Sequence, residues 1–140
     1  MQLQLTLAEV EALIEREFPQ AKALYKLDML EPMRARVRLV PEEAHLRRGG
    51  KVSGPTIFGL PDCAVYYAIL RIIGPEALTV AISATIDYMR KPAPGTDLVA
   101  DVELLKLGRA LAVGDVRVRS EGTGDIVARA TLTYSIPPKR

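Results

Sequence analysis

The sequence predicts an α+β fold in which a curved antiparallel sheet of about six strands wraps around one long apolar helix. Residues 54–73 are apolar nearly all round a helical circumference, so other elements must cover them. Alternating apolar and polar residues mark two strands before this helix and four after it. The later strands are joined by short turns, which favour antiparallel neighbours. A sheet curved around the helix would bury it on most sides.

A short amphipathic helix is expected at about residues 7–18. Thr6 and Glu9 have the spacing of a capping box, and apolar residues then recur at helical intervals until Pro19. No linker, internal repeat or low-complexity run interrupts the 140 residues. We therefore expect one domain over residues 1–140.

Six segments have the alternation of strands. In the first, Tyr25, Leu27 and Met29 share an apolar face, and in the second Met33 begins an apolar face opposite a row of arginines, Arg34, Arg36 and Arg38. The four later strands cover about residues 78–88, 98–104, 115–119 and 126–134. Residues 41–52 are polar, with Pro and paired Gly, and predict a loop.

Composition excludes several classes of protein. With 49% hydrophobic residues and a net charge of +2, the chain is neither intrinsically disordered nor strongly basic, so we expect no nucleic-acid partner. The one cysteine, Cys63, cannot form an internal disulfide, and no signal peptide is recognisable, so we expect a cytoplasmic protein. The apolar segment 54–73 contains Pro61, Asp62 and Arg71, which favours a buried helix and no membrane partner. One histidine, His45, predicts no metal site.

Asp62 is the only acidic residue on the predicted central helix. Burying a carboxylate without a partner is costly or raises its pKa. A carboxylate with a raised pKa suits a general base or a nucleophile. The alternative is a structural acid that pairs with an arginine or points along a narrow polar stripe, and the residues alone leave both open.

The start of the central helix, Ser53-Gly54-Pro55, is the second candidate for chemistry. Free N–H groups and the positive end of the helix dipole can hold negative charge developing on a carbonyl oxygen, although an ordinary cap has the same sequence. Gly54 and Asp62 lie eight residues apart, or about 12 Å along the helix axis. If both act on one carbonyl, they come from different chains of a two-fold dimer with antiparallel central helices.

These residues resemble the signature of the hotdog-fold acyl-CoA thioesterases of the phenylacetate-pathway type. That signature is His-Gly-Gly followed, after six residues, by an acid on the central helix; here Ser53-Gly54-Pro55 precedes Asp62 at the same spacing. Residues 85–92 are similar to the family's strand that ends in an Arg-Pro turn, and residues 108–128 resemble its closing hairpin. The resemblance covers residues 34–136.

The resemblance implies a hotdog dimer or tetramer that hydrolyses an acyl-CoA thioester. Asp62 would be the general base or the nucleophile, and the Gly54 N–H would polarise the thioester carbonyl. Further substrate contacts would come from Ser53, Pro55, Arg47, Tyr66 and Thr85. Coenzyme A would be part of the substrate and not a cofactor. Candidates for binding its phosphates are Arg90, Lys91, Arg48 and Lys51, and the alternative for each is a solvated loop charge.

The chain departs from the family pattern at three positions. Ser53 replaces the motif histidine, Pro55 replaces a glycine and has no N–H to donate, and Arg47 stands where relatives carry an amide. These departures favour a second hypothesis, a non-catalytic protein that binds acyl-CoA or an acyl carrier. A hotdog hydratase is a third, but its chemistry pairs a histidine with an acid, and His45 is not on the central helix. Pro61 is expected to disturb the helix beside Asp62.

Overall fold

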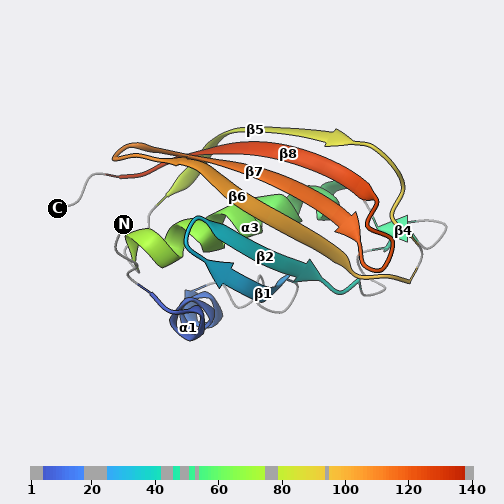
Figure 1. The fold of residues 1–140 in the computed structure, drawn as a ribbon, viewed down its shortest axis with the longest axis horizontal. Coiled ribbons are helices and arrows are strands. Elements are labelled where there is room, and N and C mark those ends of the chain that lie inside the picture. Colours follow the sequence, from blue (N-terminus) through green and yellow to red (C-terminus); the bar gives the residue numbers. More distant parts are fainter. Residues whose placement is uncertain are drawn as a thin grey trace.

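The computed structural model describes residues 5–17, 25–41, 46–47, 51–52, 54–74, 79–93 and 95–137. Six strands form one antiparallel sheet in the order β1-β2-β6-β7-β8-β5, and the sheet curves around helix α3 (Gly54–Ile73) (Figure 1). The strands are β1 (Tyr25–Glu31), β2 (Arg34–Leu39), β5 (Val80–Tyr88), β6 (Leu98–Leu107), β7 (Leu111–Ser120) and β8 (Ile126–Ser135). The predicted α+β class and the wrapped central helix are confirmed.

Helix α1 (Leu7–Glu17) begins at the predicted capping box. The Thr6 N–H donates to Glu9 Oε1 at 3.1 Å, and the Glu9 N–H donates to Thr6 Oγ1 at 3.2 Å, so two N–H groups of the first turn are satisfied. Val10, Leu13 and Ile14 are buried in the core. Residue 18, where the prediction ended, lies outside the described residues.

Helix α3 is unbroken although Pro61 lies inside it. Ten of its 20 residues are buried, including Pro61 itself, so the proline fills core space while removing one main-chain donor. The expected disturbance does not end or divide the helix. The helix has the length and composition of a membrane span, but 56% of its apolar 18-residue stretch is buried within the rest of the protein, as expected of a core helix.

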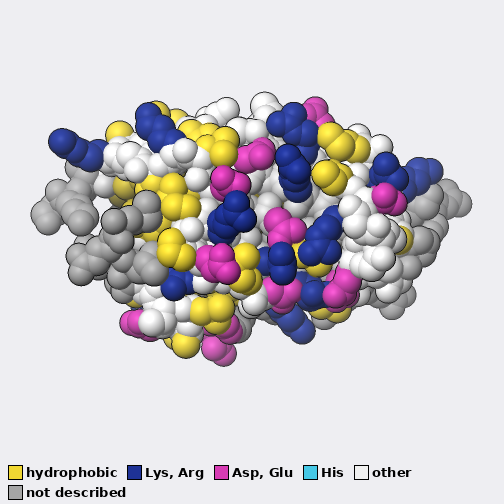
Figure 2. All heavy atoms as spheres, in the orientation of Figure 1, with side chains coloured by type: hydrophobic (Ala, Val, Ile, Leu, Met, Phe, Trp, Pro, Cys, Tyr) yellow, Lys and Arg dark blue, Asp and Glu magenta, His cyan; other side chains and the backbone are white. Residues whose placement is uncertain are grey.

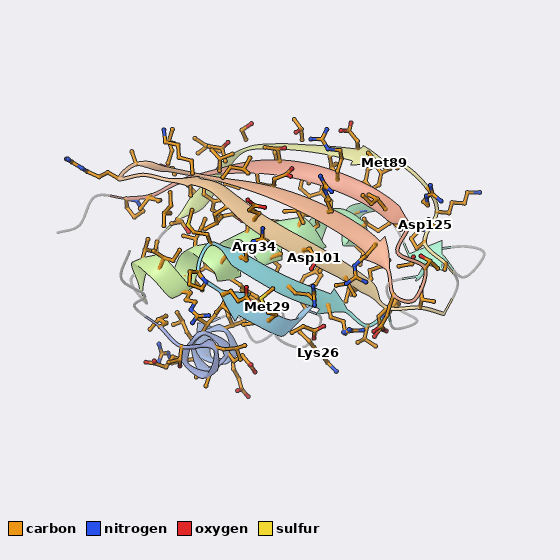
Figure 3. The ribbon with its side chains drawn as sticks, in the orientation of Figure 1. Lys26, Met29, Arg34, Met89, Asp101 and Asp125 are labelled. Carbon is orange, nitrogen blue, oxygen red and sulfur yellow. The ribbon has the colours of Figure 1, made fainter. Side chains whose placement is uncertain are left out.

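Two β-bulges change which residues face the helix. In β1 the register shifts between Leu27 and Met29, so Met29 pairs with Arg36 on the outer face and Leu30 replaces it in the core. Figure 3 labels Met29 on this strand. In β5 a shift between Ala81 and Ser83 places Val80 opposite Ser135 and on the outer face. Strict alternation predicted both Met29 and Val80 on the inner face and was wrong there. A bulge adds one residue to the strand and so reverses the face of the residues beyond it, and the sequence pattern does not mark where this happens.

Two smaller differences lie in the connections. Met33, predicted to begin the second strand on its inner face, packs against the core as predicted but sits in the turn before β2 with a φ of 65°. Within the predicted loop 41–52, Leu46–Arg47 (β3) and Lys51–Val52 (β4) pair as a short antiparallel hairpin. The hairpin leads directly into α3 and lies at the end of the molecule reached by the chain after β5 (Figure 1).

The outer face of the sheet is charged, as the row of arginines in β2 predicted. Arg36 Nε lies 2.6 Å from Asp101 Oδ1, and Arg119 Nε lies 3.2 Å from the other oxygen of the same carboxylate. Arg34 pairs with Glu103 across β2 and β6 at 3.3 Å. Figure 3 labels Arg34 and Asp101 on these strands. Basic and acidic side chains therefore alternate over this face (Figure 2), and these half-exposed pairs add little stability each.

Candidate functional site

Asp62 lies on α3 beside the last strand of the sheet. The Tyr134 hydroxyl, from β8, donates to the Asp62 carboxylate at Oδ1 and lies 3.0 Å from the Asp62 main-chain oxygen. Tyr134 is buried, whereas Asp62 is partly exposed, so the carboxylate is not enclosed by apolar groups as the sequence suggested. Within the described residues its hydrogen-bond partner is a phenol and not an arginine.

Gly54 is the first residue of α3, where the N–H groups of a helix have no partner inside the helix. The Tyr88 hydroxyl, at the end of β5, donates to the Gly54 carbonyl oxygen at 2.9 Å. A Cβ added to Gly54 would lie 3.6 Å from the same hydroxyl, an ordinary contact. Tyr88 thus fixes the first peptide of the helix to the edge of the sheet.

The structure does not bring Gly54 and Asp62 together within one chain. Because α3 is continuous, the eight residues from Gly54 to Asp62 correspond to about 12 Å along the helix axis. The two anchoring tyrosines also lie apart, because Tyr134 pairs with Ala81 near the start of β5 and Tyr88 stands at its end. The two candidate groups therefore mark opposite ends of the same edge strand.

Neutral phenol and thiol groups surround this part of the helix. Desolvation by burial, and next the neighbouring Asp62 charge, raise the pKa of Tyr134. Burial likewise raises the pKa of Tyr25 to about 12 and that of Cys63 to about 12. These groups keep their protons near neutral pH, so Tyr134 is a hydrogen-bond donor to Asp62 and not a competing base.

The other predicted substrate residues lie at several places on the surface. Tyr66 is partly exposed one helical turn after Asp62, and Pro55 is exposed at the second position of α3. Thr85 pairs with Thr131 on the outer face of β5, away from the helix side. The structure therefore groups Tyr66 with Asp62 and Pro55 with Gly54, but separates Thr85 from both.

The predicted coenzyme A ligands cluster only in part. Arg90 and Lys91 come after β5, with Met89 between, and are exposed. Arg90 lies 3.3 Å from Asp125 in a pair of which both members are more than half exposed. Arg47 and Lys51 are paired residues of the β3–β4 hairpin, whose side chains lie outside the description. Ser53 and Arg48 lie outside the described residues.

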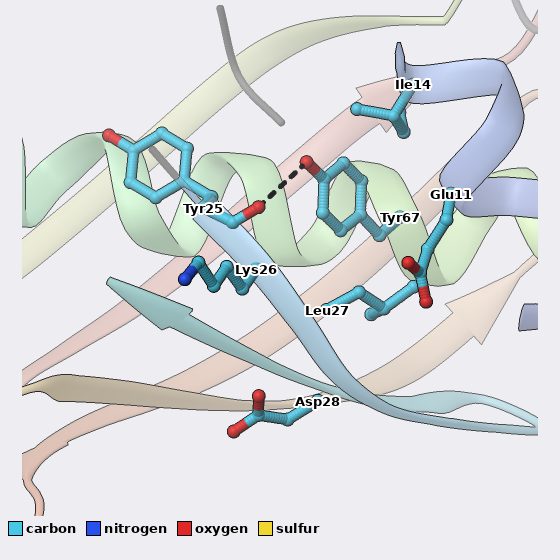
Figure 4. Close-up of a pocket in the computed structure, with 7 residues that line it drawn as sticks. All are labelled: Glu11, Ile14, Tyr25, Lys26, Leu27, Asp28 and Tyr67. Carbon is cyan, nitrogen blue, oxygen red and sulfur yellow. Dashed lines mark hydrogen bonds between the residues drawn. The ribbon is translucent and has the colours of Figure 1, made fainter. Parts of the chain in front are cut away.

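A pocket of about 370 Å³ opens between α1 and β1 (Figure 4). Its described lining residues are Glu11, Ile14, Tyr25, Lys26, Leu27, Asp28 and Tyr67. The Tyr67 hydroxyl donates to the Tyr25 carbonyl oxygen at 3.5 Å across its floor. No predicted site residue is among the described residues that line it. Within the described part of the chain, no group of three or more His, Cys, Asp or Glu side chains is placed to hold a metal ion.

Two residues of the site were not predicted as functional. The alternation places Tyr88 and Tyr134 on the inner faces of their strands, but which helix residue each one meets depends on where the helix crosses the sheet. That crossing is a tertiary property with no signal in the local pattern. The reach of a phenol to a carboxylate was therefore not predictable from the spacing alone.

Comparison with known proteins identifies the family. Residues 49–127 match the family model of the thioesterase superfamily, and no curated protein gives a significant match. A candidate thioesterase from a Silicibacter species is 47% identical with a TM-score of 0.93, covering 99% of this chain and 96% of that one. A single-residue mutant of the phenylacetic acid degradation protein PaaI from Thermus thermophilus is 30% identical with a TM-score of 0.73, covering 85% and 99%. Zebra fish thioesterase superfamily member 2, at 24% identity and a TM-score of 0.84 over 96% and 100%, shares the fold. The chain is a hotdog-fold protein of the PaaI type and belongs to the thioesterase superfamily.

Proposed function

We propose that this protein hydrolyses an acyl-CoA thioester at a site shared by two copies of the chain, with Asp62 from one copy and the Gly54 N–H from the other. The observation that carries the proposal is the Asp62 carboxylate on the central helix, where the Tyr134 hydroxyl donates to one of its two oxygens. The chain that presents this carboxylate belongs to the thioesterase superfamily. Membership of the thioesterase superfamily supports thioester hydrolysis in general. The acyl-CoA substrate and the roles of the residues are the proposal.

Strand β5 supports the shared site. It is an edge strand of nine residues, of which all but Ile86 are exposed, and Val80 and Ile82 are more than half exposed. A long apolar edge is a template for pairing with another strand. Two β5 strands paired around a two-fold axis run antiparallel, so the Tyr88 end of one lies beside the Ala81 end of the other. Because Tyr88 holds Gly54 and Tyr134 opposite Ala81 holds Asp62, this pairing carries each Gly54 towards the partner's carboxylate.

The chemistry follows from these two groups. The Gly54 N–H donates to the thioester carbonyl oxygen and stabilises the negative charge that develops there. Asp62 takes a proton from water as the water oxygen bonds to the carbonyl carbon. The carbon–sulfur bond then breaks, and the coenzyme A thiolate takes the proton from Asp62, leaving a carboxylic acid and a free thiol. If Asp62 is instead the nucleophile, its oxygen bonds to the carbonyl carbon and the carbon–sulfur bond breaks, which releases the coenzyme A thiolate and leaves a mixed anhydride. Water then cleaves the anhydride to the carboxylic acid and the Asp62 carboxylate, and the proton set free passes to the thiolate.

The exposed cations near the helix start fit the polar end of such a substrate. Arg90 and Lys91 follow Tyr88, which touches Gly54, and the exposed Arg90–Asp125 pair is weak enough to open for a phosphate. We assign the phosphates of coenzyme A to Arg90 and Lys91, with Arg47, Arg48 and Lys51 as further candidates. We propose substrate contacts for Ser53, Pro55, Tyr66 and Thr85.

Turnover of purified protein on a panel of acyl-CoA esters, followed by a thiol-detecting dye, tests the proposal. We expect hydrolysis by the wild type and a loss of about 100-fold or more in Asp62→Asn, because general base catalysis contributes about that much. Asp115→Asn, which removes a carboxylate from the outer face of β7, is the matched control and should keep full activity. A wild type that cleaves no thioester, or an Asp62→Asn variant as active as the wild type, would contradict the proposal.

One observation favours a second candidate, a non-catalytic protein that binds acyl-CoA or an acyl carrier. Pro55 occupies the second position of α3 and lacks the N–H that a glycine there would offer. Binding of a coenzyme A ester without hydrolysis would favour this candidate. Turnover by the wild type excludes it.

A further inference from the structure

We propose that Tyr134 is a positioning residue for Asp62, and that its hydroxyl engages Oδ1 so that Oδ2 is the oxygen that reacts. The inference rests on the proposed function, because it concerns the carboxylate assigned as base or nucleophile there. It adds a residue to the site and distinguishes the two oxygens of one carboxylate.

A reacting carboxylate must present one oxygen in a fixed direction. The terminal torsion of an aspartate is broad and nearly two-fold, so a partly exposed Asp62 would exchange its two oxygens unless a neighbour held one. The Tyr134 hydroxyl donates to Oδ1. Among the described residues Oδ2 has no hydrogen-bond partner, so it is the oxygen available to water or to the thioester carbon.

Tyr134 is well placed to hold that orientation. It is 4% exposed, so its ring is enclosed by the core, and β8 is hydrogen-bonded on both sides, to β7 and to β5, so its backbone is fixed within the sheet. The same hydroxyl lies 3.0 Å from the Asp62 main-chain oxygen, which ties the donor to the helix as well as to the side chain. The single phenol proton is shared between these two acceptors.

The contact differs from those of two other tyrosines, Tyr25 on β1 and Tyr67 on α3 itself. Tyr25 donates to the main-chain oxygen of Thr56 at 3.4 Å, and Tyr67 donates to that of Tyr25 at 3.5 Å. Such bonds fasten the helix to β1 but meet no reacting group. Tyr134, by contrast, contacts the carboxylate assigned to catalysis. A merely structural role and a positioning role therefore predict different results for Tyr134 and Tyr67.

Tyr134→Phe keeps the ring and removes the donor. On the thioester that the wild type cleaves fastest, we expect kcat to fall roughly tenfold while KM stays within about twofold, because the aim of the carboxylate is lost and substrate binding is not. Tyr67→Phe removes the hydroxyl of another buried tyrosine, one that donates to a main-chain oxygen and not to Asp62, and should leave kcat unchanged. Circular dichroism and thermal melting establish that both variants are folded.

Each result of these measurements either supports or overturns the role of Tyr134. An unchanged kcat in Tyr134→Phe, an equal fall in Tyr67→Phe, or a loss expressed mainly in KM would overturn the inference while leaving the proposed function intact. A wild type without thioesterase activity would defeat the proposed function, and the inference with it. If Tyr134→Phe does not fold, a crystal structure of the wild type decides: a Tyr134 hydroxyl within hydrogen-bond distance, about 3.5 Å, of one Asp62 oxygen supports the inference, and a longer separation overturns it.

Discussion

Three tyrosine hydroxyls attach helix α3 to three different strands. Tyr88 of β5 bonds the oxygen of Gly54, Tyr25 of β1 bonds that of Thr56, and Tyr134 of β8 contacts Asp62. In a chain without Trp and with only two Phe, the tyrosines combine aromatic packing with polar attachment. The helix is thereby fixed at its first turn and in its middle, where the two candidate groups for catalysis lie.

The Cys63 thiol beside Asp62 should be unreactive in the folded protein. Desolvation raises its pKa to about 12, about three units above the ordinary value, so the thiolate fraction at pH 8 falls roughly a thousandfold. We expect a thiol-detecting dye at pH 8 to label folded protein slowly and protein unfolded in guanidinium chloride at once. The folded protein also binds the Cys63 proton more tightly than the unfolded chain does. The protonated thiol therefore contributes its full share of stability below the pKa of the unfolded thiol, and this contribution declines as pH rises from there towards 12.

The unfolded sample is the control for dye access and for the intact thiol. Stoichiometric labelling of folded protein within seconds would contradict the prediction. The result also bears on the activity assay, because a slow Cys63 ensures that the dye reports the coenzyme A thiol and not the protein's own.

At the scale of elements, the sequence predicts the order and type of the six main strands and both main helices. The predictions rest on long periodic runs, such as Ile126–Ser135, and on the capping box at Thr6. The errors lie where one residue is added to a strand, at Met29 and Val80, and where two short runs pair, in the β3–β4 hairpin. A bulge is decided by how neighbouring strands fit around the helix, which a local pattern does not contain.

The close approach of β7 to α3 gives a prediction about packing. A Cβ added to the buried Gly114 would lie 2.7 Å from Val65 Cγ2 and 3.1 Å from Cγ1. Because a β-branched side chain has few rotamers to retreat into, we expect Gly114→Ala to lower the free energy of unfolding by about 1–3 kcal/mol. Urea denaturation measures it, and adding Val65→Ala should recover part of the loss.

Gly108→Ala is the matched control in the same hairpin. Its added Cβ would meet its nearest neighbours at 3.5 Å, an ordinary contact, so the free energy of unfolding should change by less than about 0.5 kcal/mol. Two results would contradict the packing of α3 on β7: a Gly114→Ala variant as stable as the wild type, or a double variant in which Val65→Ala destabilises the protein as much as it does alone.

At the scale of the whole molecule, one chain by itself does not bring Gly54 and Asp62 together, because both lie on the same continuous helix. The separation of Gly54 and Asp62 was predictable from the residues, because helical rise converts a spacing into a distance. The surface that would bring two chains together was not predictable from the residues. It depends on the exposure of β5, which follows from the position of that strand at the edge of the assembled sheet. That a second β5 covers this edge, and that the assembly is a dimer or a tetramer, remain predictions.

Mixing two inactive variants tests the shared site directly. Asp62→Asn lacks the carboxylate, and Gly54→Pro lacks the N–H while keeping a residue that the first turn of a helix tolerates. If each site combines Gly54 of one chain with Asp62 of the other, a heterodimer of the two variants contains one complete site and one that lacks both groups. Unfolding and refolding an equal mixture makes half the dimers heterodimers, so about a quarter of wild-type activity should return. Each variant refolded alone is the control and should stay inactive. No recovery, with heterodimers demonstrated by differently tagged chains, would show that Gly54 and Asp62 do not act across two subunits.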